Sequence, residues 1–404
     1  MISSNHSPLM ISQKEVLMSD PNSSMTPAIL YVEPDAPRFQ DDYRRWQGIP
    51  SIEVTEKGRI FVNFFSGQGA EVGGNFLMLC TSDDRGETFR SCVTVIEHPD
   101  PLCRIYDPCL WISPAGELWM IYNQTKGFND CRSGVWATVC KEPDAPRLEW
   151  TPPRRIANGI MINKPIVDAS GDWLFPCAIW RDECGAPPTE RHGLEQEQFS
   201  NVYASTDGGE TFSLRGSADV PNRSFDEHMI VEKKDGTLWM LVRTFDGIGE
   251  SFSRDGGRTW TPGRKSHIDG PCSRFHIRRL KSGRLLMINH FHFGERIDLD
   301  NILQQGNVKS WKGRSHLTAM LSEDDGQTWP YTLLLDERND AAYPDAKEGA
   351  DGYIYVTYDY ERVKQREILM ARFTEEDVLT GCLKSPGGRK RVLVNQALGQ
   401  PDVS

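Results

Sequence analysis

The stretch FDEHMIVEKKDGTLWMLVRTFDGIGESFSRDGGRTW, from Phe225 to Trp260, decides the fold. Its first half contains two runs typical of β-strands, HMIVE and LWMLVR, which are joined by Lys-Lys-Asp-Gly at 233–236. Asp-Gly supplies the positive φ angles that a tight hairpin turn requires. The second half ends in Ser-x-Asp-x-Gly-x-Thr-Trp at 253–260. The stretch is therefore one hairpin followed by a short signature, and a repeat of this unit would define the architecture.

The eight-residue signature occurs four times. Its copies are SDDRGETF at 82–89, STDGGETF at 205–212, SRDGGRTW at 253–260 and SEDDGQTW at 322–329. In each copy the Asp can cap neighbouring backbone N–H groups, the Gly can adopt a left-handed conformation, and the aromatic side chain can pack beneath the loop. We therefore interpret the signature as a turn between two strands.

A looser repeat covers more of the chain. Six segments share an apolar strand, a polar turn that contains Gly, and a second apolar strand; they begin at Ile49, Asp107, Lys164, Glu227, Phe275 and Tyr343. The starts are separated by 48 to 68 residues, which leaves room for one four-stranded sheet and its loops. Radial repetition of such sheets produces a propeller. The predicted fold is all-β, a six-bladed β-propeller of four-stranded antiparallel blades.

The repeat favours one domain. We predict an irregular N-terminal lead-in over 1–27, a single propeller over 28–380 and a peripheral C-terminal tail over 381–404. The strand-like run AILYVE at 28–33 is expected to complete the last blade, so that the two chain ends close the ring. Two polar insertions, at 181–198 and 294–312, are expected to be long loops, where specificity is commonly found.

Composition limits the partners and the compartment. The net charge of −11 argues against nucleic-acid and anionic membrane partners, and no apolar run approaches the ~18 residues of a membrane span. The first 20 residues lack the continuous apolar core of a secretory signal. The ten cysteines show no paired C-x-x-C spacing and mostly lie in or beside predicted strands, as reduced buried thiols do. We therefore expect a cytoplasmic protein without a metal or cofactor.

A propeller would bring charged residues together. The innermost strand of every blade starts at one face, around the central channel, so residues at those starts converge from distant parts of the sequence. They are Asp107, Lys164, Asp226, Glu227, His276, Tyr343 and Asp345. Arg243 leaves the second strand of the fourth hairpin, and Arg314 precedes the strand before the last signature. For any one of them a solvated charge is the commoner explanation, but the combined set indicates a site.

The four signatures, the six hairpins and the order of the Glu, Arg, Arg and Tyr residues resemble the sialidase (neuraminidase) superfamily, the six-bladed propeller glycosidases with Asp-box (BNR) repeats. The resemblance covers roughly residues 40–375. It implies that Tyr343 is a nucleophile paired with Glu227, and that Arg243 and Arg314 bind a substrate carboxylate. A phenol with a pKa of about 10 is a weak nucleophile unless a neighbouring carboxylate takes its proton. Among glycosidases, sialidases are an exception in using Tyr.

The sequence departs from the sialidase pattern at the first clamp arginine. That residue belongs in an aromatic-Arg-Ile-Pro motif, whereas residues 46–50 read WQGIP, so Gly48 stands in place of the Arg. Arg44 and Arg45 lie nearby but in another register, and we do not assume that they substitute. The two remaining arginines still favour an anionic ligand, because a guanidinium pairs bidentately with a carboxylate.

A second departure concerns the general acid. Sialidases place an Asp on the loop before the first signature, and the carboxylate of that loop here is Glu71. Asp107 is the competing candidate, although the aligned loop favours Glu71. Further substrate contacts are predicted at four positions: Trp46 as a ring that stacks on a sugar, Gln47 beside it, Lys164 and His276.

We expect an exo-acting glycoside hydrolase for an acidic sugar, sialic-acid-like or uronic, at the end of a glycan. One alternative is a polysaccharide lyase, or a hydrolase for a different sugar, on the same scaffold. Another is a non-catalytic propeller that binds a glycan. The fold alone does not choose among these.

Overall fold

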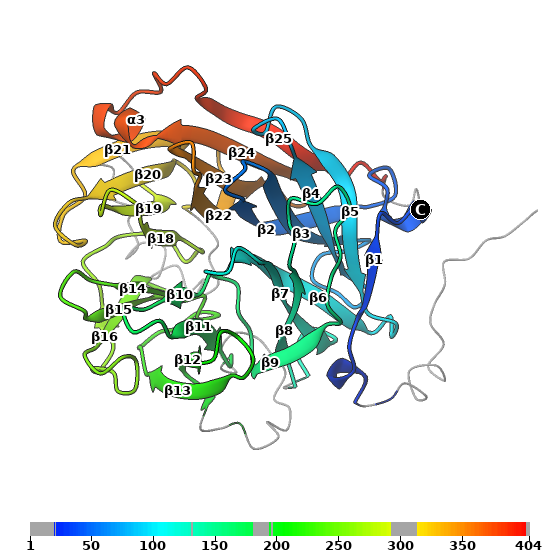
Figure 1. Cartoon of the computed structure of the whole chain (residues 1–404), viewed down its shortest axis with the longest axis horizontal. Helices are drawn as coiled ribbons and strands as arrows, with labels where there is room; N and C mark the ends of the chain where they lie inside the picture. The colour runs from blue at the N-terminus through cyan, green and yellow to red at the C-terminus, as the bar shows by residue number, and fades with distance from the viewer. Residues whose placement is uncertain are drawn as a thin grey trace, which may run out of the picture.

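The computed structural model describes residues 22–130, 132–180, 197–291 and 313–400, together with residues 20 and 194. These residues form six antiparallel sheets that follow one another around a centre, with β2, β6, β10, β14, β18 and β22 innermost (Figure 1). The predicted six-bladed propeller is confirmed. The insertions at 181–198 and 294–312 and the lead-in at 1–27 lie mostly outside the described residues.

Within the described residues blade 1 has five strands and each later blade has four. Blade 1 consists of β1 (Ile29–Val32), β2 (Trp46–Val54), β3 (Ile60–Gly67), β4 (Phe76–Ser82) and β5 (Arg90–Glu97). Blade 2 consists of β6 (Cys103–Ile112), β7 (Leu118–Lys126), β8 (Gly134–Cys140) and β9 (Arg154–Asn158). Blade 3 consists of β10 (Ile166–Val167), β11 (Trp173–Ala178), β12 (Ser200–Ser205) and β13 (Ser213–Ala218).

The second half of the chain repeats the same order. Blade 4 consists of β14 (Met229–Glu232), β15 (Leu238–Thr244), β16 (Gly247–Ser253) and β17 (Arg264–Lys265). Blade 5 consists of β18 (His276–Arg279), β19 (Leu285–His290), β20 (Leu317–Ser322) and β21 (Tyr331–Asp336). Blade 6 consists of β22 (Ala341–Glu348), β23 (Tyr353–Tyr360), β24 (Glu367–Thr374) and β25 (Arg389–Gln396), with helix α3 (Glu375–Thr380) before β25. No helix among the described residues is long and apolar enough to cross a membrane.

The chain ends close the ring differently from the prediction. Strand β1 pairs with β5 at the outer edge of blade 1, with Ile29 opposite Glu97, and does not complete the last blade. Blade 6 instead takes its outer strand from the predicted tail, because β25 pairs with β24. Alternate side chains of β25, among them Val394, pack into the core between blades 6 and 1. The propeller therefore extends to Gln396, and residues 389–396 are not peripheral.

Side chains and backbone before β2 hold the two ends together. The guanidinium of Arg44, which is fully buried, donates a hydrogen bond of 2.7 Å to Oδ1 of Asn395 on β25. The amide of Gly399 donates to the carbonyl oxygen of Arg44 at 2.8 Å, and the amide of Leu398 donates to that of Asp41 at 2.8 Å. Blades 6 and 1 are thus joined by hydrogen bonds as well as by apolar packing.

The apolar core is divided among the interfaces between neighbouring blades. In the described residues, one buried cluster lies between each successive pair of blades, including the pair formed by blades 6 and 1. Between blades 2 and 3, for example, the ring of Trp173 lies edge-on to Trp111 and Trp119, with centroids 4.7 and 5.5 Å apart. Aromatic pairs favour this geometry, which explains why the inner hairpins are rich in Trp.

The predicted turn signature is confirmed as the connection between the third and fourth strands of blades 1, 3, 4 and 5. In blade 1, Oδ1 of Asp84 accepts hydrogen bonds from Ser82 Oγ at 2.7 Å and from the amides of Glu87 and Thr88 at 3.0 Å. The hydroxyl of Thr88 donates to Oδ2 at 2.5 Å, and this bond, followed by those from the Thr88 amide and Ser82, lowers the pKa of Asp84 to about 2. Gly86 has a φ of 82°. Because strands alternate in direction, these turns lie at the end opposite to the starts of the inner strands, away from the predicted site.

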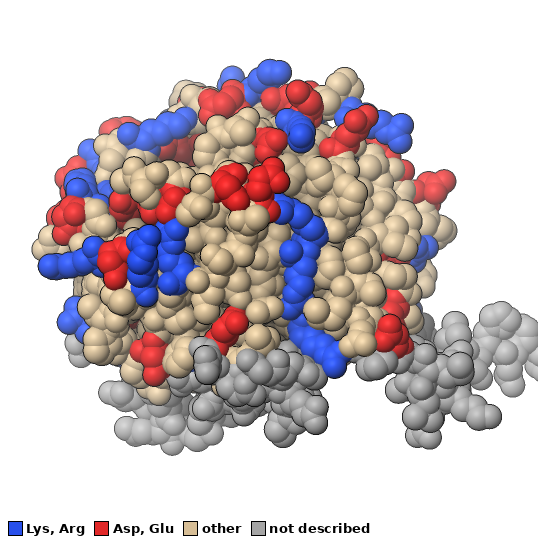
Figure 2. All heavy atoms as spheres, turned by 60° about the horizontal axis from the view of Figure 1, so that its bottom comes forward, with Lys and Arg blue, Asp and Glu red and all other residues tan. Residues whose placement is uncertain are grey.

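The surface carries both signs of charge. Figure 2 shows Lys and Arg beside Asp and Glu over the upper and left parts of one face. On that face the net charge of −11 is therefore not gathered into one acidic patch.

Candidate active site

A cavity of about 450 Å³ opens at the face where the inner strands begin. Six of the residues singled out in the sequence line it: Trp46, Glu71, Asp107, Glu227, Arg314 and Tyr343. They come from blades 1, 2, 4 and 6 and from the segment that precedes β20. The structure thus brings residues that are hundreds of positions apart to one place.

The inner strands reach this cavity through irregular backbone. The β-ladder register shifts between Gly48 and Ser51 in β2, between Tyr106 and Cys109 in β6, and between Ala342 and Asp345 in β22. A residue with a positive φ sits in each gap, namely Ile49 at 58°, Asp107 at 45° and Tyr343 at 57°, and Glu227 has a φ of 37° just before β14. All four line the cavity. Bulges re-aim side chains, and strained conformations of this kind cluster at functional sites.

Tyr343, Glu227 and Arg243 form one hydrogen-bonded group. The Tyr343 hydroxyl donates to Oε1 of Glu227 at 3.1 Å. Nη1 of Arg243 donates to the same carboxylate oxygen at 2.5 Å and to the Tyr343 hydroxyl at 2.8 Å. Burial raises the pKa of Tyr343, while the positive charge of Arg243 acts in the opposite direction. The phenol is therefore neutral at rest, with a proton acceptor and a cation both in contact with its oxygen.

Asp107 has the environment of a carboxyl group that keeps its proton. Burial raises its pKa to about 7, against the attraction of Arg104, and the nearby charges of Glu71 and Glu227 add to the rise. Glu71 lies at the rim, where 41% of its side chain is exposed. No three His, Cys, Asp or Glu side chains are grouped as metal ligands in the part of the chain that the structure describes.

The cavity is also lined by residues that the sequence analysis did not identify, among them Arg104, Trp180 and Arg362. The guanidinium of Arg104 stacks on the Tyr106 ring, 4.0 Å from its centroid. Arg362 follows β23, whose end lies at the same face as the starts of the inner strands. Arg362 directly follows the second strand of the hairpin in blade 6, and that place could have indicated it, but the sequence carries no motif there.

Four predicted substrate contacts do not line the cavity, and one of them, Arg243, is fully buried but donates to the Tyr343 hydroxyl. Gln47 is fully buried, and its Nε2 donates to the carbonyl oxygens of Arg366 and Asn395. Lys164 and His276 are buried in the central channel, where Lys164 forms an ion pair with Asp345 at 3.1 Å and Nδ1 of His276 lies 3.1 Å from the other oxygen of the same carboxylate. β10 begins at Ile166, two residues after Lys164, whereas His276 is the first residue of β18, so a place at a strand start does not by itself bring a side chain to the cavity.

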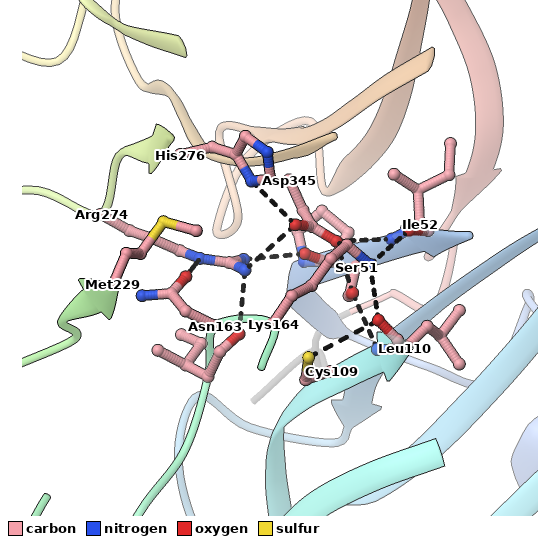
Figure 3. Close-up of polar contacts among 12 residues, drawn as sticks. Ser51, Ile52, Cys109, Leu110, Asn163, Lys164, Met229, Arg274, His276 and Asp345 are labelled. Carbon is pink, nitrogen blue, oxygen red and sulfur yellow. Dashed lines mark hydrogen bonds and ion pairs between the residues drawn. The ribbon is translucent and has the colours of Figure 1, made fainter. Parts of the chain in front are cut away.

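The channel below the cavity is filled by a polar network with Asp345 at its centre (Figure 3). Oδ2 of Asp345 accepts hydrogen bonds from Ser51 Oγ at 2.6 Å and from the Ile52 amide at 2.9 Å. Lys164 donates to the carbonyl oxygens of Ile52 and Leu110 at 2.7 and 2.5 Å. The positive charge of Lys164 and the hydrogen bond from His276 hold the pKa of Asp345 well below its usual value in spite of burial. Blades 1, 2, 3, 5 and 6 are thereby joined at the axis.

The same network supports the backbone of the site. Arg274 donates from Nε to Asn163 Oδ1 at 2.7 Å, and the amide group of Asn163 donates in turn to the carbonyl oxygens of Glu227 and His228 at 2.7 and 3.2 Å. Arg274 also lies beside Asn163 and Asp345 in Figure 3. The strained residue Glu227 is therefore held from below by a side chain of blade 3.

The comparisons with known proteins agree with this architecture. The BNR repeat-like domain family matches residues 58–356, and no curated protein matches the chain. The Hadza microbial sialidase Hz136 is 18% identical, over 79% of this chain and 64% of that one, with a TM-score of 0.60. A leech intramolecular trans-sialidase is 12% identical, over 87% and 71%, with a TM-score of 0.62. An α-L-arabinanase from Penicillium chrysogenum is 10% identical, over 88% and 99%, with a TM-score of 0.54.

At these identities the similarity to solved structures shows the fold alone, and the chain spans less than two thirds of the length of Hz136. The family match, in contrast, covers well over half of the chain. The chain therefore belongs to the BNR repeat-like domain family, and its six-bladed propeller is similar in fold to the solved sialidase.

Proposed function

We propose that this protein is a glycoside hydrolase that removes an acidic sugar, sialic-acid-like or uronic, from the end of a glycan. The observation that carries the proposal is the contact between the Tyr343 hydroxyl and Glu227 at 3.1 Å, in a cavity that also contains Asp107. Hydrolysis through a covalent intermediate requires a nucleophile that is hydrogen-bonded to a general base, here Tyr343 and Glu227, and a separate proton donor, here Asp107.

In the first step Tyr343 Oη attacks the anomeric carbon and Glu227 accepts the phenol proton. Arg243 Nη1, at 2.8 Å from the same oxygen, stabilises the negative charge that develops on it. The bond from the anomeric carbon to the leaving oxygen breaks, and Asp107 donates its proton to that oxygen. A pKa of about 7 suits this role, because the group is substantially protonated at neutral pH yet can give the proton up.

In the second step Asp107, now ionised, takes a proton from water, and the resulting hydroxide attacks the anomeric carbon. The bond to Tyr343 breaks, and Glu227 returns the proton to the phenolate. Each group ends in its starting state, so the cycle needs no further reactant. The neutral phenol also suits an anionic sugar, since it does not repel the substrate as a carboxylate nucleophile would.

The acidic nature of the substrate is inferred from the guanidinium groups around Tyr343. Arg314 lines the cavity and lies 5.3 Å from the centroid of the Tyr343 ring. Arg243 lies 5.9 Å from the same centroid. A planar guanidinium pairs with a carboxylate through two parallel hydrogen bonds, so a sugar carboxylate is the ligand group that these residues fit.

A panel of aryl glycosides tests the proposal. It contains an aryl sialoside, an aryl glucuronide and neutral glucosides, galactosides and arabinosides, and release of the aryl alcohol is followed by absorbance. We expect hydrolysis of an acidic member, and a loss of kcat on the order of 10²–10⁴ in Tyr343→Phe and in Glu227→Gln. Tyr122→Phe is the matched control, because it removes a buried phenol hydroxyl that has no hydrogen-bond partner among the described residues.

Other outcomes would identify other functions on the same scaffold. An unsaturated product that absorbs in the ultraviolet would indicate a lyase, and turnover of neutral members alone would indicate a hydrolase for a different sugar. Binding of a glycan with no turnover of any member would indicate a binding propeller. Undiminished turnover in both Tyr343→Phe and Glu227→Gln would refute the mechanism.

A further inference from the structure

Gly48 lies on the innermost strand of blade 1, and the space in which its side chain would begin is filled by a residue of blade 6. A Cβ atom added to Gly48 would lie 2.7 Å from Cδ of Arg362 and 3.0 Å from its Cγ and Nε. Non-bonded carbon atoms prefer separations of about 3.5–4.0 Å, so no side chain fits at position 48 while Arg362 stays in place. Gly48 and Arg362 are therefore two parts of one packing arrangement.

The guanidinium of Arg362 is fixed in the wall of the cavity. Its Nε donates to Oδ2 of Asp359 at 2.7 Å, and the same carboxylate oxygen accepts from the Ile49 amide at 2.8 Å. Its Nη1 lies 3.9 Å from Oε1 of Glu71 at the rim. Its Nη2 is buried and has no hydrogen-bond partner among the described residues. A fixed guanidinium in a cavity wall with an unused N–H group is suited to bind an anionic group of a ligand.

Three described guanidinium groups surround the ring of Tyr343. Arg362 is the nearest, with its central carbon 3.9 Å from the ring centroid, compared with 5.3 Å for Arg314 and 5.9 Å for Arg243. They come from blade 6, from the segment before β20 and from blade 4. Three arginines thus surround the Tyr343 ring although position 48 has none.

We propose that Arg362 binds the carboxylate of the acidic sugar together with Arg243 and Arg314, in the place that an arginine at position 48 would otherwise occupy. This inference rests on the proposed function and adds the residue that completes recognition of the anion. The glycine is then required, because it leaves the space through which the stem of Arg362 passes.

Binding of matched acids and esters tests the proposal separately from catalysis. The probes are N-acetylneuraminic acid and glucuronic acid, each compared with its methyl ester, and their Kd values are measured by calorimetry. The full-length protein is expected to bind one acid more tightly than its ester. Arg362→Met should raise the Kd of that acid about 10- to 100-fold, since it removes hydrogen bonds from a charged donor, and should leave the Kd of the ester within about twofold.

A charge at the rim provides the control. Lys364 is exposed over 78% of its side chain and lies 3.8 Å from Glu361. Lys364→Met removes the same unit of charge from the neighbourhood, and solvent and salt screen such a charge. Its effect on the ratio of the two Kd values should stay below about twofold.

An exchange of positions gives the sharpest result. Gly48 does not have a positive φ, so its backbone accepts an arginine once the space is free. Arg362→Met should reduce the ratio of the ester Kd to the acid Kd. The double variant Gly48→Arg, Arg362→Gly should restore at least half of that reduction in the logarithm of the ratio, whereas Gly48→Arg alone should raise the Kd of the acid. Thermal unfolding confirms that each variant is folded, and the exchange variant decides the question if Arg362→Met does not fold.

The outcomes separate this inference from the proposed function. If acidic glycosides are hydrolysed and Arg362→Met keeps the full preference for the acid, or the folded exchange variant recovers none of it, the role of Arg362 is refuted and the proposed function stands. If the full-length protein prefers no acid to its ester and hydrolyses no acidic glycoside, both are refuted.

Discussion

Asp107→Asn should make the protein more stable and less active at the same time. Ionising Asp107 in the folded protein is unfavourable, because burial raises its pKa to about 7 from about 3.9 in an unfolded chain. At about 1.4 kcal/mol per pKa unit, this difference corresponds to roughly 4 kcal/mol of stability lost in the wild type above neutral pH. Asparagine removes the ionisation, and it tolerates the φ of 45° at this position as well as aspartate does.

The sign of the effect follows from the order of the two pKa values. Below about pH 4 the carboxyl is protonated in both the folded and the unfolded state, so the substitution changes little. Between about pH 4 and pH 7 only the unfolded state is ionised, so the wild type loses stability as the pH rises and the variant does not. Above pH 7 both states are ionised, and the difference levels off at its largest value.

Urea unfolding at pH 5, 6, 7 and 8, followed by tryptophan fluorescence, measures this difference. We expect the variant to gain on the wild type by about 1 kcal/mol per pH unit up to pH 7. Glu71→Gln is the control, because this half-exposed side chain should change the free energy of unfolding by less than about 0.5 kcal/mol. In Asp107→Asn, kcat should fall on the order of 10²–10⁴, because the second step lacks its base, and the fall of wild-type activity above pH 7 should disappear. Asp107→Asn with unchanged or lower stability at pH 8 would refute the reasoning.

Three further predictions concern the scaffold. Asp345→Asn should lower the free energy of unfolding by about 3–5 kcal/mol, because it leaves the buried cation of Lys164 with one partner fewer; a loss under 1 kcal/mol in urea unfolding would contradict the network's role. Asn163→Ala should lower kcat by about tenfold or more with a smaller change in KM, because it frees the carbonyl oxygens of Glu227 and His228; equal changes in both constants would count against a positioning role. Gly209→Ala should destabilise by roughly 2–4 kcal/mol, since its Cβ would lie 2.5 Å from Trp173, whereas Gly236→Ala, also at positive φ but in open space, should cost only about 1 kcal/mol; similar melting temperatures would be inconsistent with this difference.

The repeats predicted the blades because each signature satisfies its own hydrogen bonds locally. Asp84 and its counterparts accept hydrogen bonds from residues two to four positions away, so the eight residues of the signature suffice to specify the turn. The pairing of the chain ends is not local. An apolar run such as residues 29–32 can pair with any exposed strand edge, and the sequence does not say that it lies on β5 instead of completing blade 6.

The sequence likewise predicted the position of some site residues and not of others. Glu227 and Tyr343 were predicted from their positions at the starts of the fourth and sixth inner hairpins, and the structure places the Tyr343 hydroxyl 3.1 Å from Oε1 of Glu227. Lys164 and His276 stand at similar positions in sequence but lie in the channel, where both contact Asp345, and the strand pattern does not show which side chains turn into the channel. Arg362 could not be found from a motif, because its position depends on space left by a glycine in another blade.

Mass spectrometry of the quenched enzyme shows directly whether Tyr343 forms a covalent bond to the sugar. Asp107→Asn is mixed with the aryl glycoside that the wild type hydrolyses best, because an aryl leaving group needs little help from an acid whereas the second step lacks its base. If Tyr343 is the nucleophile, we expect a burst of aryl alcohol and a mass increase of one glycosyl residue on the peptide that contains Tyr343. Turnover without a burst or adduct, together with full activity of Tyr343→Phe, would contradict it.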